Sequence, residues 1–366
     1  MNILILGGTG AMGKPLAGLL AKSNQVWVTS RSERQSDNPN LHYIQGNAKQ
    51  CDFLTTICGM QAWDAIVDFM VRNVSQLKEF LPLFLDSTKQ YVFISSARVY
   101  AECDGLITEE SPRLLDVSTD KNYLKTNEYA LAKAREEDAL RQCGRKNYTI
   151  IRPSITYNDY RLQLGVMEKE DFVYRVLHGR KIVFSHDLES RLTTMTHGND
   201  VARGIAAIIG QNEALGETFH ITSPKSLTWG DVLSIYKKVL EEHLGHSIDI
   251  KWTEKTTNYK LTNQIYRIKY CRMYNRTFDN SKISKFIDVN SFVSPEEGLS
   301  TCLTHFLAKP RFGFKSWKLE GVNNRVTGEK LQKGETKRFA DWLWYVTYRH
   351  DLKLFIKLMK LYIKNR

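Results

Sequence analysis

The 366-residue sequence has no apolar stretch long enough to span a bilayer, for which a helix needs about 20 apolar residues. Its start, MNILILGG, resembles a signal peptide only superficially, because it lacks a basic beginning and runs directly into a glycine loop. The six cysteines are scattered without a CxxC pair or a cluster suited to a metal. We therefore expect reduced thiols in a cytoplasmic protein and no metal site.

The overall composition, 42% hydrophobic and 25% charged, is that of an ordinary globular protein of one large domain or two modest ones. The charge is unevenly distributed. Residues 311–366 contain 14 Lys and Arg against 5 Asp and Glu, so they carry +9 of the formal net charge of +12. This asymmetry favours an anionic partner for the C-terminal region.

Short apolar segments alternate with helical patterns along the first part of the chain. We expect strands at 2–6, 25–29, 42–45, 63–69, 91–95 and 148–152, with helices at 14–22, 51–60, 74–84 and 127–141. Apolar strands that alternate with helices predict an α/β fold of the Rossmann type, a doubly wound parallel sheet with both faces covered.

The alternation ends after Pro153. A dinucleotide-binding domain is predicted at 1–155, with 195–215 packing back on it, and a smaller substrate domain at 156–310. Within the substrate domain, helical periodicity at 162–182 and 227–242 is mixed with short strands such as 217–221 and 247–252. Residues 311–366 form a basic C-terminal extension.

A strand–loop–helix pattern, ILILGGTGAMGKPL, opens the chain. Gly7, Gly10 and Gly13 follow an apolar strand and lead into a helix. Glycine suits a tight turn that a pyrophosphate must approach closely, and the helix start offers free amides. The loop predicts a dinucleotide site, in which we include Ala11 and Met12.

Two further strand ends are expected near the cofactor. Ser30 and Arg31 close the second strand, where NAD sites commonly carry an acidic residue and an arginine suits the 2′-phosphate of NADP. NADP is therefore favoured over NAD, and a solvated arginine is the alternative. Asp68 and Phe69 end the fourth strand, where Asp68 can equally cap a turn.

Tyr129 and Lys133 stand four residues apart in YALAKAREEDAL, a helical pattern. Positions i and i+4 share a face, and a nearby ammonium favours the ionised form of a phenol. Such a tyrosine can exchange a proton with a substrate hydroxyl. The spacing alone is also consistent with chance placement on the surface.

Four motifs occur in order along the chain: GGTGAMG, ISSARVY, YALAK and TIIRPSITY. This set resembles the extended short-chain dehydrogenase/reductase family, the NAD-dependent epimerases and dehydratases, over about residues 1–310. The resemblance implies a catalytic serine, tyrosine and lysine, which match Ser96, Tyr129 and Lys133. It also implies that Asn47 lies near the adenine.

The resemblance places Pro153 and Ile155 beside the nicotinamide, and residues that merely end a strand are the alternative. Ser95 is expected to be structural or to touch the cofactor. The two residues after Ser96 are alanine and arginine, whereas sugar-nucleotide dehydratases carry an Asp-Glu pair there. This departure argues against 4,6-dehydration.

Related enzymes bind a nucleotide-diphosphate sugar in the second domain through arginines. Arg191 resembles one of them, and Arg272 and Arg276, in a basic segment rich in tyrosine, are candidate phosphate ligands. That segment is otherwise a solvated loop, and basic residues among aromatics can also bind RNA. His197 and Asp200 are expected to cap or anchor the helix that follows them.

The last residues, DLKLFIKLMKLYIKNR at 351–366, place lysines at helical spacing among apolar residues, with two tryptophans upstream. A basic amphipathic helix is typical of an interfacial membrane anchor, so residues 340–366 predict peripheral contact with the inner face of a membrane. A helix that packs on the body or on a second subunit is the alternative.

Together these features predict an NAD(P)-dependent sugar-nucleotide epimerase that works by transient hydride transfer, as a cytoplasmic homodimer. Two alternatives stay open. One is an NADPH-dependent reductase of a sugar or other carbonyl compound, which Arg31 favours. The other is a non-catalytic nucleotide-sensing or RNA-binding protein on the same fold, although the intact Ser–Tyr–Lys set favours an enzyme.

Overall fold

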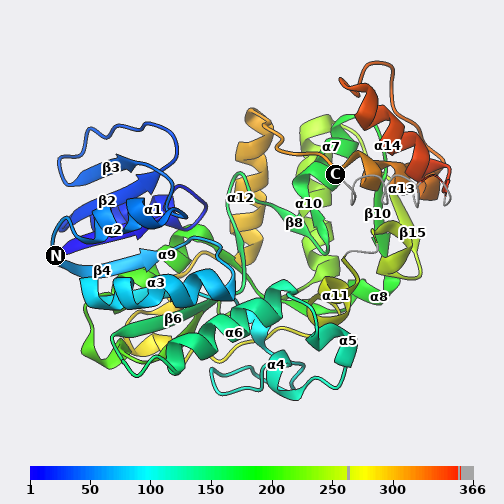
Figure 1. Cartoon of the computed structure of the whole chain (residues 1–366). Coiled ribbons are helices and arrows are strands. Elements are labelled where there is room, and N and C mark those ends of the chain that lie inside the picture. Colours follow the sequence, from blue (N-terminus) through cyan, green and yellow to red (C-terminus); the bar gives the residue numbers. More distant parts are fainter. Residues whose placement is uncertain (262–263, 353–354, 356–366) are drawn as a thin grey trace. The chain divides into compact units, whose positions relative to one another are not determined.

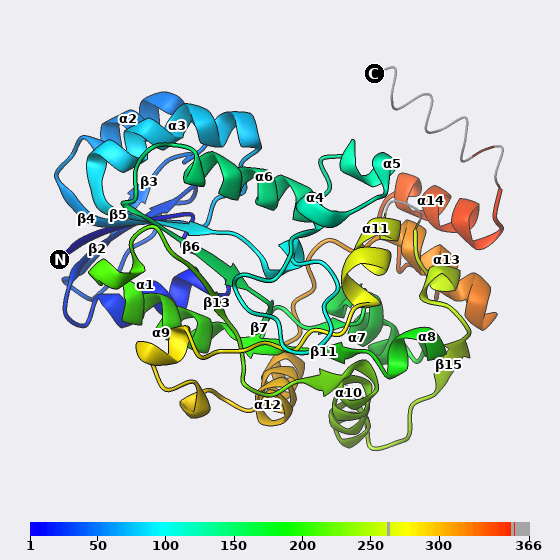
Figure 2. The same ribbon diagram turned by 90° about the horizontal axis from the view of Figure 1, so that it is seen from below.

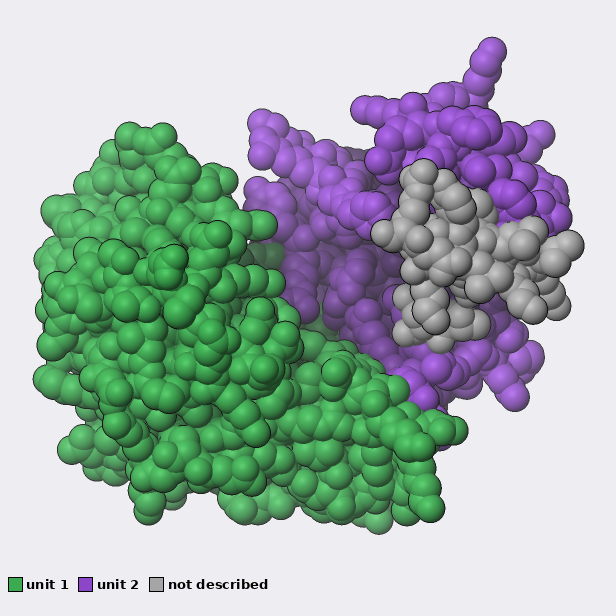
Figure 3. All heavy atoms as spheres, viewed as in Figure 1, with its two compact units in different colours: residues 1–158, 194–226, 276–298 green, residues 159–193, 227–275, 299–366 purple. Residues whose placement is uncertain are grey.

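The computed structural model describes residues 1–261, 264–352 and 355. The chain forms two compact units, which Figure 3 colours separately. The first comprises 1–158, 194–226 and 276–298, and the second comprises 159–193, 227–275 and 299–366. Two segments thus return to the first unit after the chain has left it. The assignment of cofactor and substrate to these units stays a prediction.

A seven-stranded parallel sheet forms the centre of the first unit (Figure 1, Figure 2). Its strands lie in the order β13 (Thr218–Ile221), β6 (Tyr148–Pro153), β5 (Thr88–Ile94), β4 (Trp63–Asp68), β1 (Asn2–Leu6), β2 (Gln25–Ser30) and β3 (Leu41–Gln45). The direction of winding reverses between β1 and β4, the point at which open sheets of this kind bind ligands. The predicted Rossmann-type fold is confirmed.

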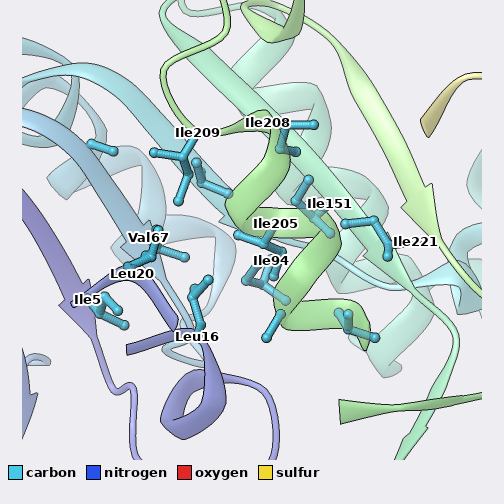
Figure 4. Close-up of a cluster of buried hydrophobic side chains, with 14 of the residues drawn as sticks. Ile5, Leu16, Leu20, Val67, Ile94, Ile151, Ile205, Ile208, Ile209 and Ile221 are labelled. Carbon is cyan, nitrogen blue, oxygen red and sulfur yellow. The ribbon is translucent and has the colours of Figure 1, made fainter. Parts of the chain in front are cut away.

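Helices cover both faces of this sheet. On one face, α1 (Gly13–Leu20) and α9 (Gly198–Ile208) pack on strand residues such as Ile5 and Ile151 in a buried apolar cluster (Figure 4). On the other face, a second cluster includes residues of α2 (Cys51–Cys58), α3 (Val74–Ser87) and α6 (Tyr129–Arg141). Because each fully buried isoleucine contributes about 1.5–3 kcal/mol, α9 stabilises the sheet although it comes from a returning segment.

Shorter elements complete the first unit. They are η1 (Ala97–Val99), α4 (Leu114–Val117), α5 (Lys121–Leu124), β7 (Ile155–Tyr157), β12 (Met195–His197), η2 (Asn212–Ala214), η6 (Ile283–Lys285) and η7 (Val289–Ser291). The strands β7 and β12 pair in parallel. Helix α12 (Pro295–Ala308) begins in the residues of the first unit and ends in those of the second.

The second unit contains small two-stranded sheets and helices. Its strands are β8 (Gln163–Leu164), β9 (Met167–Glu168), β10 (Ile182–Ser185), β11 (Leu192–Thr193), β14 (Leu227–Thr228) and β15 (Ile250–Thr253). Its helices are α7 (Lys169–Leu177), α8 (His186–Glu189), α10 (Trp229–Leu244), η3 (Thr256–Tyr259), α11 (Ile265–Arg267), the π-helix η5 (Ile268–Arg272), α13 (Trp317–Thr327) and α14 (Phe339–Arg349).

The helical periodicity at 162–182 corresponds to one shorter helix, α7, Lys169–Leu177. Residues 163–168 form the antiparallel pair β8–β9, and the helix begins only at Lys169. Gly165 lies between the two strands with a φ of 58°, a left-handed conformation that turns the chain back on itself. A single glycine in an apolar segment gave no periodic signal of this turn.

The predicted amphipathic helix at the C-terminus lies outside the described residues, apart from 351, 352 and 355. In the part of the chain that the structure describes, no helix combines the length and the hydropathy that a membrane span requires. That part also contains no group of His, Cys, Asp and Glu side chains suited to a metal ion.

Candidate active site

The glycine loop connects β1 to α1 at the carboxyl edge of the sheet. Gly7 has a φ of 71°, and its amide donates to the hydroxyl of Thr29 at 2.9 Å. A Cβ on Gly13 would lie 2.6 Å from the Cα of Gly8, whereas a Cβ on Gly10 would meet nothing within 4 Å. The loop is therefore tightly packed at Gly13 and open at Gly10, an arrangement that fits a pyrophosphate at the start of α1.

Ala11 and Met12 occupy the end of this loop. The sulfur of Met12 accepts a hydrogen bond from the hydroxyl of Thr156, in β7, at 3.7 Å. The carbonyl oxygen of Ala11 closely approaches Gly198, the first residue of α9, where a side chain would not fit. Elements from later in the chain therefore hold the loop in place.

The end of β2 carries the residues predicted to contact the adenosine part of a cofactor. Ser30 is buried, and its hydroxyl accepts from Nε of Arg34 at 3.1 Å, while Arg31 is exposed. Asn47, after β3, accepts from the amide of Lys49 at 3.1 Å and shapes the turn before α2. Sequence reasoning missed Arg34, a second cation at this edge, because a loop has no periodicity that would mark it.

Asp68 ends β4 in a fully buried position. Its carboxylate accepts hydrogen bonds from the Met70 amide at 2.8 Å, the Tyr91 hydroxyl at 2.9 Å and Nε of Arg72 at 3.1 Å. Burial, reinforced by the charge of Asp68, raises the pKa of Tyr91, which therefore stays a neutral donor. The hydrogen bond from the Met70 amide caps the turn after β4, which is the alternative role that the sequence suggested for Asp68. Phe69 packs against the apolar core.

The short helix η1, which Ser96 caps, packs against α6, the helix that begins at Tyr129. Ser96 caps η1, with its hydroxyl accepting from the Arg98 amide at 3.2 Å. The guanidinium of Arg98 lies over the ring of Tyr129, with its Cζ 5.2 Å from the ring centroid. Tyr129 is the first residue of α6 and remains 39% exposed, so a substrate can reach it.

Glu128 holds this arrangement from the helix start. One oxygen forms an ion pair with Nη2 of Arg98. The other accepts from the Ala130 amide at 2.8 Å and from the Tyr123 hydroxyl at 3.2 Å. A carboxylate is favoured there by the helix dipole as well. Sequence reasoning missed Glu128, because an acidic residue before a helix is a common cap that signals no chemistry.

Lys133 lies one turn after Tyr129 and is only 4% exposed. Its Nζ pairs with the carboxylate of Glu136 at 2.9 Å and lies 4.6 Å from the ring centroid of Phe93. Burial raises the pKa of Glu136, and the ammonium of Lys133 offsets this only in part. Lys133 is therefore ion-paired with Glu136, a residue that sequence reasoning did not single out.

Glu137 ties α6 to the end of β6. Its carboxylate accepts from the Ser95 hydroxyl at 2.6 Å and from Arg152 through Nε at 2.8 Å and Nη2 at 2.6 Å. Burial alone would raise the pKa of Glu137, but the bonds from Arg152 outweigh it and lower the pKa. Ser95 thus has a structural partner, which agrees with one of the two roles expected of it. Pro153 ends β6, and Ile155 begins β7.

Comparison with known proteins identifies the family. The model of the "NAD dependent epimerase/dehydratase family" matches residues 3–222, which is more than half of the chain and includes the glycine loop, Ser96 and Tyr129. The chain belongs to this family. A search of curated protein sequences gives no match.

Solved structures share the fold of this epimerase/dehydratase chain. UDP-glucuronic acid 4-epimerase from Bacillus cereus, solved with UDP-glucuronic acid and NAD, has a TM-score of 0.64 at 17% identity over 85% of this chain and 100% of that chain. The dTDP-glucose 4,6-dehydratase from Bacillus anthracis, solved with NAD, has a TM-score of 0.63 at 18% identity over 84% of this chain and 97% of that chain. A double mutant of dTDP-glucose 4,6-dehydratase from Streptomyces venezuelae has a TM-score of 0.64 at 21% identity over 85% of this chain and 98% of that chain. Identities this low establish the extended short-chain dehydrogenase/reductase fold alone.

The arginines predicted to bind substrate in this family member lie in different surroundings. Arg272 is buried, and its Nε donates to the Gly165 carbonyl at 2.8 Å. Arg276, which belongs to the first unit, is also buried and donates from Nη2 to the Tyr100 carbonyl at 2.9 Å. Arg191 is partly exposed. Contact of the three with a nucleotide sugar stays a prediction.

Two residues of the same stretch have the structural roles predicted for them. Nδ1 of His197 accepts from the Asn199 amide at 3.2 Å and caps α9. Asp200 is buried, pairs with Arg203 at 2.9 Å and accepts from the Val293 amide at 2.9 Å. The prediction that they cap and anchor this helix is confirmed.

Proposed function

We propose that this family member is an NAD(P)-dependent sugar-nucleotide epimerase that works by transient hydride transfer. One observation carries the proposal: η1, capped by Ser96, packs against α6, and Arg98 of η1 lies over the ring of Tyr129, the first residue of α6. A protein that only binds nucleotides has no need of a serine and an accessible tyrosine in this arrangement. The relative solved with UDP-glucuronic acid supports a nucleotide sugar as the substrate.

The residues at the sheet edge fit a dinucleotide. The open space at Gly10 and the amides of α1 suit its pyrophosphate. We favour NADP over NAD, because Arg31 and Arg34 place two guanidinium groups after β2, where a 2′-phosphate would lie. The bound nicotinamide would supply a transient acceptor of hydride. Because relatives are solved with NAD, the dinucleotide itself is an outcome of the test below.

The side chains of the site have separate tasks in the proposed reaction. Tyr129 exchanges the proton of the reacting hydroxyl, and Ser96 orients that hydroxyl through a hydrogen bond. Arg98 keeps the tyrosine ring in position. Lys133 has three donors on its ammonium, of which Glu136 occupies one, so it retains donors for the ribose of the cofactor.

Tyr129→Phe tests the proton transfer. Phenylalanine keeps the ring under Arg98 but has no proton to exchange, so we expect kcat to fall by about 10²–10⁴-fold while bound dinucleotide is retained. UDP-glucuronic acid and dTDP-glucose are offered as first substrates, epimers are detected by NMR, and the dinucleotide released on denaturation is identified by mass spectrometry. Unchanged activity of the variant would contradict the role of Tyr129.

An NADPH-dependent reductase is the second candidate, and the arginine pair after β2 favours it. An epimerase returns the hydride to its substrate and turns over without added dinucleotide, whereas a reductase consumes one NADPH for each product. Oxidation of NADPH in step with product formation would establish the reductase. If neither NAD nor NADP binds the purified protein, both enzymatic proposals are wrong.

The proposal extends to partners. We expect the first unit to hold the cofactor and the second to bind the nucleotide sugar, in a cytoplasmic homodimer.

The oligomeric state is measured by light scattering of the purified protein, and a monomeric mass would exclude the dimer. Labelling by a photoreactive nucleotide sugar, mapped by mass spectrometry, tests whether Arg191, Arg272 and Arg276 lie near the substrate.

A further inference from the structure

Helices α13 and α14 lie side by side as a hairpin in the second unit (Figure 1). Glu320 of α13 is buried and pairs with Arg175 at 2.6 Å and with Lys315 at 2.9 Å. Glu335, between the two helices, pairs with Arg180 at 2.8 Å. Because buried charges require their partners, these ion pairs fix the hairpin to the rest of the unit.

In the connection between α13 and α14, the acidic side chains are paired with arginines of the unit while the lysines are exposed. The acidic side chains turn inward, since Glu329 pairs with Arg175 at 2.7 Å and Glu335 pairs with Arg180. Lys330, Lys333 and Lys337 are exposed, and the described residues provide no ion-pair partner for any of them. A segment of mixed charge in the sequence therefore presents a cationic outer surface.

An aromatic pair follows this cationic segment at the start of α14. Phe339 is 75% exposed and Trp342 is 45% exposed, and their rings stack with centroids 5.6 Å apart. Residues three apart on a helix share a face, so the pair forms one apolar protrusion. Trp344 differs, because its ring lies 3.7 Å from the ammonium of Lys318 within the hairpin.

We propose that Lys330, Lys333, Lys337, Phe339 and Trp342 form a surface that binds an anionic lipid bilayer. Aromatic side chains are favoured at the boundary between headgroups and acyl chains, and lysines beside them attract anionic headgroups. An exposed aromatic pair that directly follows a segment with three exposed lysines has this complementary chemistry. The proposal is independent of the enzymatic function, because it requires neither cofactor nor substrate.

Two features favour lipid over nucleic acid as the partner. The rings of Phe339 and Trp342 stack on each other, so their inner faces cannot receive a base. The sequence that follows, 353–366, has five Lys and Arg and no acidic residue, but also eight large apolar residues. Such a composition is typical of interfacial membrane segments.

Co-sedimentation with lipid vesicles tests the surface. The full chain is mixed with vesicles of phosphatidylcholine alone and of phosphatidylcholine and phosphatidylserine in equal parts. We expect binding to the anionic vesicles only. The variant F339A/W342A should lose about tenfold or more in affinity, and K330Q/K333Q/K337Q should lose about as much and depend less on salt. All five side chains are exposed, so the variants are expected to fold.

Matched controls separate this surface from general effects of charge and apolarity. K22Q/K146Q/K251Q removes the same charge from exposed lysines elsewhere, and L106A removes another exposed apolar side chain. Both should bind like the wild type. The proposal is wrong if the wild type ignores anionic vesicles, if F339A/W342A binds unchanged, or if the control triple weakens binding as much. Binding of single-stranded RNA that is lost in F339A/W342A, without vesicle binding, would assign the surface to nucleic acid.

Discussion

Lys260 shows what burial does to a single charge. Its Nζ is buried and lies 3.7 Å from a carboxylate oxygen of Asp171. Burial lowers the pKa of Lys260 to about 8, and the charge of Asp171 offsets this only in part. Above that pH the unfolded chain still holds the proton that the folded chain has released. The contribution of this group to stability therefore rises with pH until both states are neutral.

Lys260→Met should accordingly stabilise the protein near neutral pH. Methionine keeps an apolar stem of similar length and removes a charge that is costly to bury. We expect the free energy of unfolding to increase by about 1–3 kcal/mol at pH 7 and this gain to shrink as the pH rises above 8. Urea unfolding at pH 7 and pH 9.5 measures it. A loss of stability at pH 7, or a gain independent of pH, would contradict the argument.

Lys133 shows how far residue spacing alone can lead. The stretch YALAKAREEDAL was correctly predicted to be helical, and α6 begins at Tyr129, four residues before Lys133. The spacing did not reveal that Lys133 is covered by Phe93 and paired with Glu136. Burial depends on which strand the helix packs against, and the helix sequence does not contain this information.

At the scale of elements, the start of α6 combines a structural and a chemical task in Glu128. One oxygen caps the helix through the Ala130 amide, and the other pairs with Arg98. The cap supports the stability of the helix, and the pair places a guanidinium over the ring of Tyr129. Substitutions at this position can separate the two tasks.

Glu128→Gln should retain the cap and lose the charge. An amide oxygen can still accept from Ala130, so we expect a loss of stability below about 1 kcal/mol. Arg98 is then no longer held over Tyr129, and we expect kcat to fall by about tenfold with a changed pH profile. Glu128→Ala loses both tasks and should be less stable as well. Equal stability of the two variants, or a glutamine variant with the kcat and pH profile of the wild type, would exclude this division.

Most elements of the first unit follow from local patterns. The predicted strand at 2–6 is β1 itself, and the helix predicted at 14–22 is α1, Gly13–Leu20. In the second unit the helical periodicity at 162–182 extended beyond α7, because Gly165 turns the chain between β8 and β9. Apolar strands and apolar helices look alike over a few residues, and only long-range pairing distinguishes them.

At the scale of the whole molecule, buried ion pairs join segments that lie far apart in the sequence. Glu320 is 1% exposed and lies among Arg175, Arg180 and Lys315. Burial alone would raise the pKa of Glu320, but these three cations outweigh it and lower the pKa. The carboxylate is therefore charged, and its removal leaves cations buried without their partner.

Glu320→Gln should strongly destabilise the second unit. We expect a loss of about 3–5 kcal/mol in the free energy of unfolding, because several buried cations lose one anion. Glu329→Gln is the matched control, since Glu329 is partly exposed and pairs with Arg175 alone among these cations. It should cost about 1 kcal/mol. Unfolding in guanidinium chloride measures the free energy of unfolding of both variants. Equal losses would show that the burial of Glu320 does not increase its contribution to stability.

The amino-acid sequence by itself determined the parallel sheet, the glycine loop and the positions of Ser96 and Tyr129. These features depend on periodicity and spacing within short segments, where each residue is constrained mainly by its neighbours in the chain. The family match over residues 3–222 covers the same features.

Only the tertiary structure decided which charges are neutralised and which remain exposed. It buried Arg272 and Arg276 against backbone carbonyls, turned Glu335 inward to Arg180 and left Lys333 exposed. The physical reason is that the energy of a charge depends on the burial and the partners it receives from distant segments. Those partners exist only once the chain has folded.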